Sequence, residues 1–478
     1  MSAARAIEAL QLALPGVQLH VQGTKEFEEF NTSYLSTFES DITPAAIVFP
    51  KTPEHVSAFL KTIKPFVTND QITFAVRGAG QQPLPGCANI QGGITLDLAL
   101  LRGIELDLDT GIVSIGAGER WGAVYEKLSG HGLAITGSRS AKGGIGGLAL
   151  AGGLSFFSTR EGFICDNVVA YEIVVASGEV IKCSVNANPD LYKSLRGGGN
   201  NFGIVTRYHM KTFKQGPFWG GNVFYDPPSF PNQVDALVHH LQDAQVETHV
   251  MISLFFAAQF GMPLCLNQVY YTRDTESPPI LDPFVNMEPQ RHERKFLRMI
   301  NMKDAADEQA SMSADGIRVA YVNTTVKADA ATLKAAADKF TASLDLVKDC
   351  KGVVFSLTFQ PYPVSLLKKC LLAGGNVTGL TPADGPLVSV LVLMNWENKN
   401  DDETILGTAR SILEAVDEDA AARGQAVPYK YLNYAFDFQD PIGSYGAKNK
   451  QFLQEVSKRF DPDGVFQQGV PGGFKLFS

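Results

Sequence analysis

Three glycine-rich segments place the strongest constraint on how this chain can fold. They are VRGAGQQPLPGCANIQGG at residues 76–93, KGGIGGLALAGG at residues 142–153 and LRGGGNNFGIVT at residues 195–206. Glycine lets the backbone adopt positive φ and approach a ligand closely, so that successive N–H groups can converge on an anion. Tight turns alone would explain any one segment. Three segments in one region predict a loop-built site for a diphosphate.

The second segment also matches a nucleotide-binding motif in part. Gly144, Gly146 and Ala149 have the spacing of a dinucleotide-binding βαβ unit, which needs a hydrophobic strand directly before it. The preceding residues, ITGSRSAK, make a poor strand, and the Walker pattern GxxxxGK[ST] is absent from the sequence. Neither a NAD-type Rossmann domain nor a P-loop is therefore predicted.

Length and composition limit the class of protein. A chain of 478 residues is longer than one hydrophobic core usually supports, so we expect two domains. A content of 45% hydrophobic and 19% charged residues is typical of a globular protein. The formal net charge of -9 disfavours nucleic acid and anionic lipid as partners. The six cysteines form no CxxC pair, and the histidines form no HxH or HExxH pattern, so we expect no metal site. With no signal peptide or membrane span evident, we expect a cytoplasmic protein.

The order of elements indicates an α+β fold. Short β-branched runs between Pro44 and Phe213 alternate with helical patterns beginning at Pro53 and Trp121. The segment GPFWGGNVFYDPPSFP, at 216–231, is rich in glycine and proline and is interpreted as a domain junction. Apolar runs at 249–260, 352–361 and 387–396 then predict one sheet, and helices are expected over 330–347 and 401–422.

Long motifs in a fixed order identify a family. RGAGQ, GGITLDL, GAGERW, GGIGGLALAGGLSFFSTREGFICDNVVAYEIV, NPDLYKSLRGGGNNFGIVTR, YLNYAFDFQDPIGSYG and FDPDGVFQQGVPGG cover nearly the whole chain. Together they resemble the FAD-linked oxidases of the vanillyl-alcohol oxidase superfamily, and more narrowly their fungal berberine-bridge-enzyme-like branch. The resemblance implies an α+β fold with a two-subdomain PCMH-type FAD-binding domain over 1–213. It further implies a substrate domain with an antiparallel sheet backed by helices over 214–425, and a C-terminal return to the FAD-binding domain over 426–478.

The same resemblance implies where FAD binds. The first two segments would surround the ribityl chain and the diphosphate, the third would hold the adenine end, and YLNY would return Asn433 and Tyr434 to the isoalloxazine ring. The cofactor-binding residues implied in this chain are Arg77, Gly78, Ala79, Gly80, Gln81, Gly143, Gly144, Gly147, Gly152, Ile204, Val205 and Asn433.

The chain departs from the family where many members bond covalently to the flavin. The usual histidine position is Gln81, and the region of the usual cysteine reads AITGSRSAKGG. An amide nitrogen is not a usable nucleophile, whereas neutral imidazole and thiolate are. We therefore expect non-covalent FAD, with Cys87 and His131 as the alternatives to be checked.

The resemblance implies an FAD-dependent oxidoreductase of secondary metabolism. It would oxidise an apolar small molecule by hydride transfer to flavin N5, with O2 as acceptor. Two other hypotheses are a redox-neutral, FAD-containing isomerase or cyclase and a flavin-free binding protein. The catalytic base is not identified by sequence, but the candidates are Tyr271, Tyr362, Tyr434 and Gln360. Leu254, Phe256, Leu357, Phe359 and Leu393 on the expected strands face either the substrate or the core. Oligomeric state is not indicated.

Overall fold

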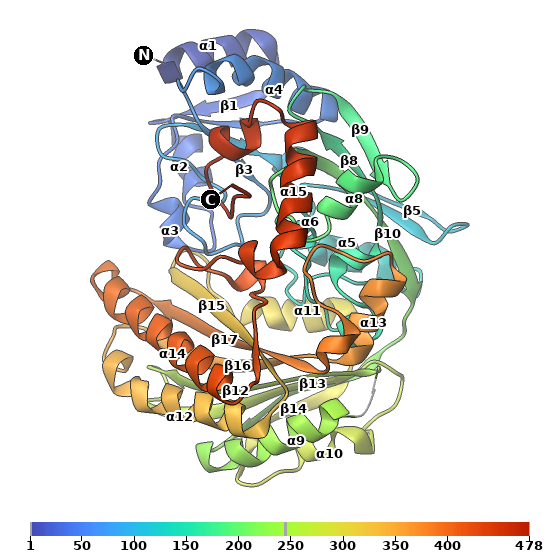
Figure 1. Ribbon diagram of the computed structural model, residues 1–478, viewed down its shortest axis with the longest axis vertical. Coiled ribbons are helices and arrows are strands. Elements are labelled where there is room, and N and C mark those ends of the chain that lie inside the picture. The colour runs from blue at the N-terminus through green and yellow to red at the C-terminus, as the bar shows by residue number, and fades with distance from the viewer. Residues whose placement is uncertain (1, 243–245, 478) are drawn as a thin grey trace.

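The short β-branched runs form the strands of the first sheet, and helices connect them. The computed structural model describes residues 2–242 and 246–477, and Figure 1 shows their arrangement. The strand order is β1 (Gln18–Val21), β2 (Ala46–Phe49), β4 (Ile94–Asp97), β3 (Phe74–Arg77), in which only β1 runs antiparallel to its neighbour. Its helices are α1 (Ser2–Ala13), α2 (Lys25–Asn31), α3 (Thr37–Ser40) and α4 (Pro53–Val67). Helix α4 begins as the sequence predicts, because Thr52 Oγ1 accepts from the His55 N–H at 3.3 Å.

A second, antiparallel sheet carries the remaining two glycine-rich segments. Its strand order is β5 (Ile104–Asp107), β6 (Ile112–Gly116), β10 (Ile204–Lys214), β8 (Val168–Val174), β9 (Val180–Ser184), with β7 (Leu133–Ile135) paired to the end of β10. The helices of this region are α5 (Trp121–Ser129), α6 (Ile145–Leu150), α7 (Ser158–Glu161) and α8 (Pro189–Ser194). The second segment opens α6, and the third runs from α8 into β10. The two segments are in contact, because the N–H groups of Gly197 and Gly199 donate to the carbonyl oxygen of Leu150.

The later half of the chain builds an eight-stranded antiparallel sheet. Its order is β14 (Gln290–Ile300), β11 (Phe218–Tyr225), β13 (Met262–Tyr271), β12 (Thr248–Ala257), β16 (Val354–Tyr362), β17 (Leu387–Trp396), β15 (Arg318–Lys327), β18 (Ala426–Val427). The helices are α9 (Phe230–Gln242), α10 (Asp282–Val285), α11 (Met302–Ser311), α12 (Ala330–Val347), α13 (Val364–Leu372) and α14 (Asp402–Ala422). Helices α9, α12 and α14 cover the outer face of the sheet and share a core with it (Figure 1).

The segment at 216–231, interpreted as a domain junction, lies where the chain passes from β10 of the second sheet to β11 of the large sheet. It is not an unstructured linker, because β11 pairs on both sides, with β13 and β14. Its glycines are required by close backbone approach. A Cβ at Gly221 would lie 1.9 Å from the carbonyl oxygen of Phe296. Glycine here belongs to a packed strand rather than to a linker.

The chain finally returns to the upper half of the molecule, where it began. After β18, helix α15 (Ala447–Phe460) packs against α8, and Leu453, Val456 and Phe466 join the core formed by the first two sheets. Figure 1 shows this return as the red segment that runs upward from the large sheet. No helix within the described residues is long and apolar enough to cross a membrane.

Candidate functional site

A cavity of about 290 Å³ lies where the three glycine-rich segments meet. Its lining from the first half of the chain comprises Val76, Gly78, Ala79, Gly80, Gln81, Gln82, Leu84, Cys87, Ala88, Leu98, Ser138, Gly143, Gly144, Gly146, Gly147, Leu148, Leu150, Ala151, Gly199, Asn200, Gly203, Ile204, Val205 and Tyr208. The later part contributes Tyr321, Leu432, Asn433, Tyr434, Phe466, Gly473 and Phe474. Segments more than 300 residues apart in sequence, such as Gly78 and Asn433, therefore share one wall.

Close backbone contact joins the first two segments. A Cβ at Gly144 would lie 2.5 Å from the Cβ of Ala79, so only glycine allows the two loops to approach this closely. Arg120 holds them together, because its guanidinium donates to the carbonyl oxygens of Lys142 at 2.5 Å and Ala79 at 3.1 Å. The third segment is tied to the second, since the N–H groups of Gly197 and Gly199 both donate to Leu150 O at 3.0 Å.

The first loop presents unused hydrogen-bond donors to the cavity. Among the residues that the structure describes, the backbone N–H groups of Gly78, Ala79, Gly80 and Gln81 donate to no other protein group. Gly80 has φ +65°, and a Cβ there would lie 2.9 Å from Arg77 Nε, so glycine is needed on both counts. Backbone amides that face a cavity without an acceptor favour an anionic ligand there.

Two of the implied cofactor-binding residues do not line this cavity. Arg77 is buried behind the loop, where its guanidinium donates to Phe30 O at 2.9 Å and Ser33 O at 2.8 Å and lies 3.4 Å from Asp97 Oδ2. It therefore supports the loop from behind. Gly152 lies at the end of α6, where its carbonyl oxygen accepts from the N–H of Cys165 at 2.8 Å. All the other implied residues line the cavity.

Comparison with known proteins identifies the family. A family model described as an FAD binding domain matches residues 44–184. FAD-dependent monooxygenase tpcD of Cochliobolus heterostrophus is 37% identical over 447 residues, which cover 91% of this chain and 85% of that protein. FAD-dependent monooxygenase FUP4 of Fusarium proliferatum is 35% identical over 461 residues, or 94% of this chain and 88% of that protein. The chain belongs to the FAD-linked oxidases of the vanillyl-alcohol oxidase superfamily, in their fungal berberine-bridge-enzyme-like branch.

Solved structures show that the fold of this FAD-linked oxidase is shared more widely. 6-Hydroxy-D-nicotine oxidase from Arthrobacter nicotinovorans superposes with a TM-score of 0.78 at 20% identity, over 95% of this chain and 97% of that one. Berberine bridge enzyme from Eschscholzia californica superposes with a TM-score of 0.77 at 14% identity, over 98% and 99%. The predicted α+β fold, the FAD cofactor and the assignment as an FAD-dependent oxidoreductase are confirmed. The hypothesis of a flavin-free binding protein is therefore wrong.

The residues that line the cavity suit the chemical groups of FAD. A loop of unused N–H groups and an open glycine surface suit a diphosphate, because a Cβ at Gly147 would meet no atom within 4 Å. Apolar side chains from several elements suit planar rings, and they include Leu84, Leu148 and Phe474. Asn433 is fixed in this wall, since its amide donates to Ala151 O at 3.2 Å and to the hydroxyl of Tyr431 at 2.9 Å.

The positions relevant to covalent attachment fall in different environments. Gln81, at the usual histidine position, lines the cavity of about 290 Å³. Cys87 also lines it, but burial raises the pKa of this thiol well above its usual range, and Sγ donates to Glu39 Oε1 at 3.1 Å. His131 is exposed in the turn after α5 and does not line the cavity. A protonated thiol is a weak nucleophile.

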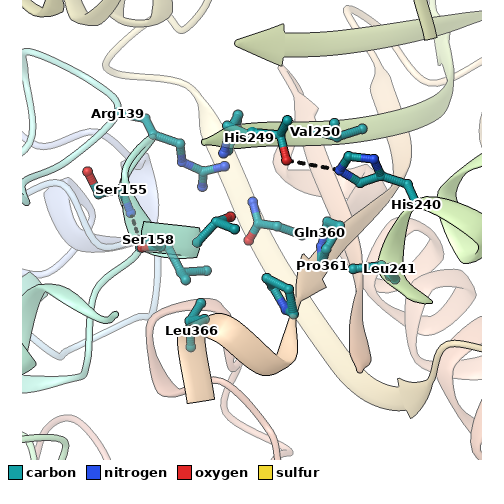
Figure 2. A pocket seen from close by; sticks show the side chains of 14 residues that line it. Arg139, Ser155, Ser158, His240, Leu241, His249, Val250, Gln360, Pro361 and Leu366 are labelled. Atoms are coloured by element: carbon teal, nitrogen blue, oxygen red, sulfur yellow. Dashed lines mark hydrogen bonds between the residues drawn. The ribbon is translucent and has the colours of Figure 1, made fainter. Parts of the chain in front are cut away.

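A smaller pocket of about 30 Å³ contains residues of the large sheet in its lining (Figure 2). It is lined by Arg139, Leu154, Ser155, Ser158, Thr159, His240, Leu241, Thr248, His249, Val250, Gln360, Pro361, Pro363 and Leu366. Arg139 connects the two spaces, because it lines the pocket while its Nη2 donates to the hydroxyl of Tyr434, which lines the cavity. Sequence reasoning missed Arg139, since a lone arginine in a loop carries no motif.

The candidate bases do not all reach these spaces. Tyr434 lines the flavin cavity and Gln360 lines the smaller pocket. Tyr271 and Tyr362 line neither, and Tyr362 is buried against the rings of Phe163 and Tyr429. Tyr434 is itself packed edge-on against Tyr321, with ring centroids 5.8 Å apart, and against Tyr431 at 4.7 Å.

The apolar strand residues mostly belong to the core. Leu254, Phe256, Leu357 and Phe359 are buried in the cluster that the large sheet shares with its outer helices. The ring of Phe359, for example, lies 5.7 Å from that of Phe230 on α9. Leu393 is partly exposed and lines neither space. These residues therefore carry no information about the substrate.

Proposed function

We propose that this protein oxidises an apolar small molecule of secondary metabolism, with FAD held non-covalently in the glycine-lined cavity. When bound, FAD would accept hydride at N5 and pass the electrons to O2. The observation that carries the proposal is that residues 78–81, whose N–H groups have no protein acceptor among the described residues, line the same cavity as Tyr434. A diphosphate site and a polar substrate-side group thus share one space.

The protein's own residues would bind FAD, orient the substrate and exclude water from the site. The N–H groups of the first loop would hold the diphosphate, and Asn433 would fix the wall that faces the ring. Tyr434 is our candidate for the group that accepts the substrate proton at Oη, since it is the one base candidate on the cavity wall among the described residues. Its hydroxyl is kept in place by the donor Arg139.

Non-covalent binding is supported by Gln81 and by the protonated Cys87. Precipitation with trichloroacetic acid tests it directly. We expect the yellow colour to stay in the supernatant, and flavin retained in the protein pellet would contradict the proposal. A Cys87→Ala variant run in parallel would then show whether that thiol forms the bond.

Monooxygenation is a second candidate, because the relatives tpcD and FUP4 are both named FAD-dependent monooxygenases. Turnover under 18O2 separates the two reactions once a substrate has been found among apolar alcohols and phenols. An oxidase releases the label as hydrogen peroxide, whereas a monooxygenase places one labelled atom in the product. Product formed without O2 and without bleaching of the flavin band would instead support the redox-neutral isomerase or cyclase.

A cytoplasmic location and a small-molecule partner complete the proposal. All six cysteines are free, as expected of a protein in a reducing compartment. Subcellular fractionation of a tagged full-length chain tests the location, and we expect the protein with the cytosolic markers.

A further inference from the structure

Arg139 carries a positive charge that no acidic side chain neutralises. Among residues 2–242 and 246–477 this partly buried arginine forms no ion pair within 4.0 Å, whereas three more deeply buried arginines do. Those that are paired include Arg77 with Asp97, Arg196 with Asp166 and Arg318 with Asp402. Arg139 is only partly buried, so water can solvate its charge while the guanidinium remains accessible to an anion that enters the pocket.

The neighbours of Arg139 are neutral. Its Nη1 lies 2.5 Å from Met251 Sδ, and its Nη2 donates to the Tyr434 hydroxyl. In the amide orientation that satisfies both of its polar atoms, Gln360 accepts from Nη1 through its oxygen at 2.5 Å. Figure 2 shows Arg139 and Gln360 pointing toward one another across the pocket. The same Gln360 oxygen also accepts from Nη2 at 3.0 Å, so neutral partners engage both Nη groups, and an anion would bind through Nε or by replacing the Gln360 oxygen.

His249 adds a neutral, buried imidazole to this pocket. Burial, and secondly the charge of Arg139, lower its pKa to about 3, so the imidazole is neutral at physiological pH. Its Nε2 is buried and has no hydrogen-bond partner among the described residues. The pocket therefore combines one positive charge with an unsatisfied polar atom and no negative charge.

We propose that Arg139 binds an anionic oxygen of the substrate, such as a carboxylate or an aromatic or enolic oxyanion. This inference rests on the proposed function. The pocket of about 30 Å³ has room for such a polar group but not for an aromatic ring, so the apolar body would lie on the Tyr434 side, in the larger cavity. Arg139 would thus select acidic substrates and fix their orientation, because an anionic oxygen can replace the neutral Gln360 oxygen as the shared acceptor of Nη1 and Nη2.

The position of Arg139 favours the substrate over the flavin as the source of the anion. Its side chain lines the smaller pocket with Val250, Pro361 and Leu366, which come from the large sheet and the helix after it. It is not part of the wall of the flavin cavity. An anion bound there would therefore contact the substrate side of the site.

Calorimetric titration of the FAD-loaded protein with benzoate and with its neutral isostere benzamide tests the proposal. We expect the wild type to bind benzoate at least about tenfold more tightly than benzamide, since a charge-assisted hydrogen bond contributes that much or more. Arg139→Met should weaken benzoate binding by about 10- to 100-fold and leave benzamide binding nearly unchanged. Arg139→Lys should restore part of the benzoate affinity, because it keeps the charge but not the fork.

The matched control is Arg410→Met, which removes the same charge from an exposed ion pair with Glu414 on α14. It should leave both affinities as in the wild type. Equal affinities for the two probes in the wild type would overturn the proposal. So would an unchanged benzoate affinity in Arg139→Met with a shifted FAD reduction potential, because Arg139 would then serve the cofactor.

The FAD content and melting temperature of Arg139→Met show whether it folds, and Arg139→Lys keeps the test decisive if it does not. The calorimetric signal does not depend on turnover, so failure of the oxidation itself is seen separately, as absence of flavin bleaching.

Discussion

At the residue scale, two glycines of the same segment meet different surroundings. A Cβ at Gly144 would lie 2.5 Å from that of Ala79, whereas a Cβ at Gly147 meets no protein atom and enters the cavity. We therefore expect Gly147→Ala to leave the apoprotein as stable as the wild type but to weaken FAD binding by about tenfold or more, as overpacking by a methyl does. Thermal melting of the apoprotein and fluorescence titration with FAD measure the two effects.

Gly144→Ala is the matched comparison. Its methyl must push the two loops apart, so we expect it to destabilise the apoprotein by about 1–3 kcal/mol as well as to weaken FAD binding. If Gly147→Ala bound FAD like the wild type, the second segment would not contact the cofactor.

Glu39 gives the stability of the protein a specific pH dependence. Burial raises its pKa from 4.5 to about 7, while Oε1 accepts from the N–H of Ala88 at 2.9 Å. The folded state holds the proton more tightly than the unfolded state, so this contribution to stability is complete below about pH 4.5 and is lost as the pH rises through about 7. Glu39→Gln cannot ionise. Between pH 5 and pH 8 its unfolding free energy should therefore fall by less than that of the wild type, by up to about 3 kcal/mol.

Urea unfolding of both proteins at several pH values measures this difference, and shared titrations of other groups cancel in the comparison. Parallel pH profiles would show that Glu39 ionises normally in the folded protein.

The sequence predicted some residues of the candidate site but not others. Gly78–Gln81 and Gly144 could be found because a backbone that approaches a ligand or another loop requires glycine, and clustered glycines are visible in a sequence. Arg139 could not be found, because its interest depends on having no acidic side chain beside it. Its neighbours Met251, Gln360 and Tyr434 come from distant parts of the chain.

At the scale of elements, Asn323 on β15 attaches the returning chain to the large sheet. Its amide donates to Tyr431 O at 3.0 Å and accepts from the Tyr431 N–H at 2.8 Å. Asn323→Ala would leave both buried backbone groups unpaired, which we expect to cost about 2–4 kcal/mol of stability. Because the next residues carry Asn433 and Tyr434 into the cavity, FAD binding should weaken too. Urea unfolding and FAD titration measure these losses.

The control for this element is Gln451→Ala, which removes only an exposed hydrogen bond to Glu455 on α15. It should change stability by less than about 0.5 kcal/mol. An Asn323→Ala protein as stable as this control would mean that the segment is held by other contacts, such as those of Gln439 with the backbone of Asn323.

Periodicity located some of the elements, and where it did so the physical reason is clear. The apolar runs and the helix at 330–347 became β12, β16, β17 and α12, because each buries one face against the others. The glycines and prolines at 216–231 indicated a junction but not the strand β11 within it, since local composition cannot show that neighbouring strands approach closely enough to exclude a Cβ. Strand order in the large sheet was likewise not predictable, as sequential neighbours such as β14 and β15 lie far apart in it.

At the scale of the whole molecule, the cavity wall combines segments from the beginning, middle and end of the chain. The first loop, Tyr321 on β15, the Asn433 segment and Phe474 near the C-terminus all contribute. The family resemblance implied that the C-terminal part returns to the flavin, whereas spacing along the sequence could not, because no local signal reports contact between segments so far apart. A ligand in this cavity must therefore link the stability of all these parts.

This linkage yields the final prediction, which also tests how FAD is held. If FAD binds reversibly and only to the folded state, free FAD at 100 times its dissociation constant should stabilise the protein by about 2.7 kcal/mol. For a chain of 478 residues this corresponds to a rise in melting temperature of roughly 3 °C. The melting temperature should climb with the logarithm of FAD concentration, fall again on dialysis, and climb less in Gly147→Ala at equal FAD. A melting temperature that ignores added FAD in a yellow, fully loaded protein would mean that the cofactor is covalently attached, since a bonded ligand contributes no mass-action term.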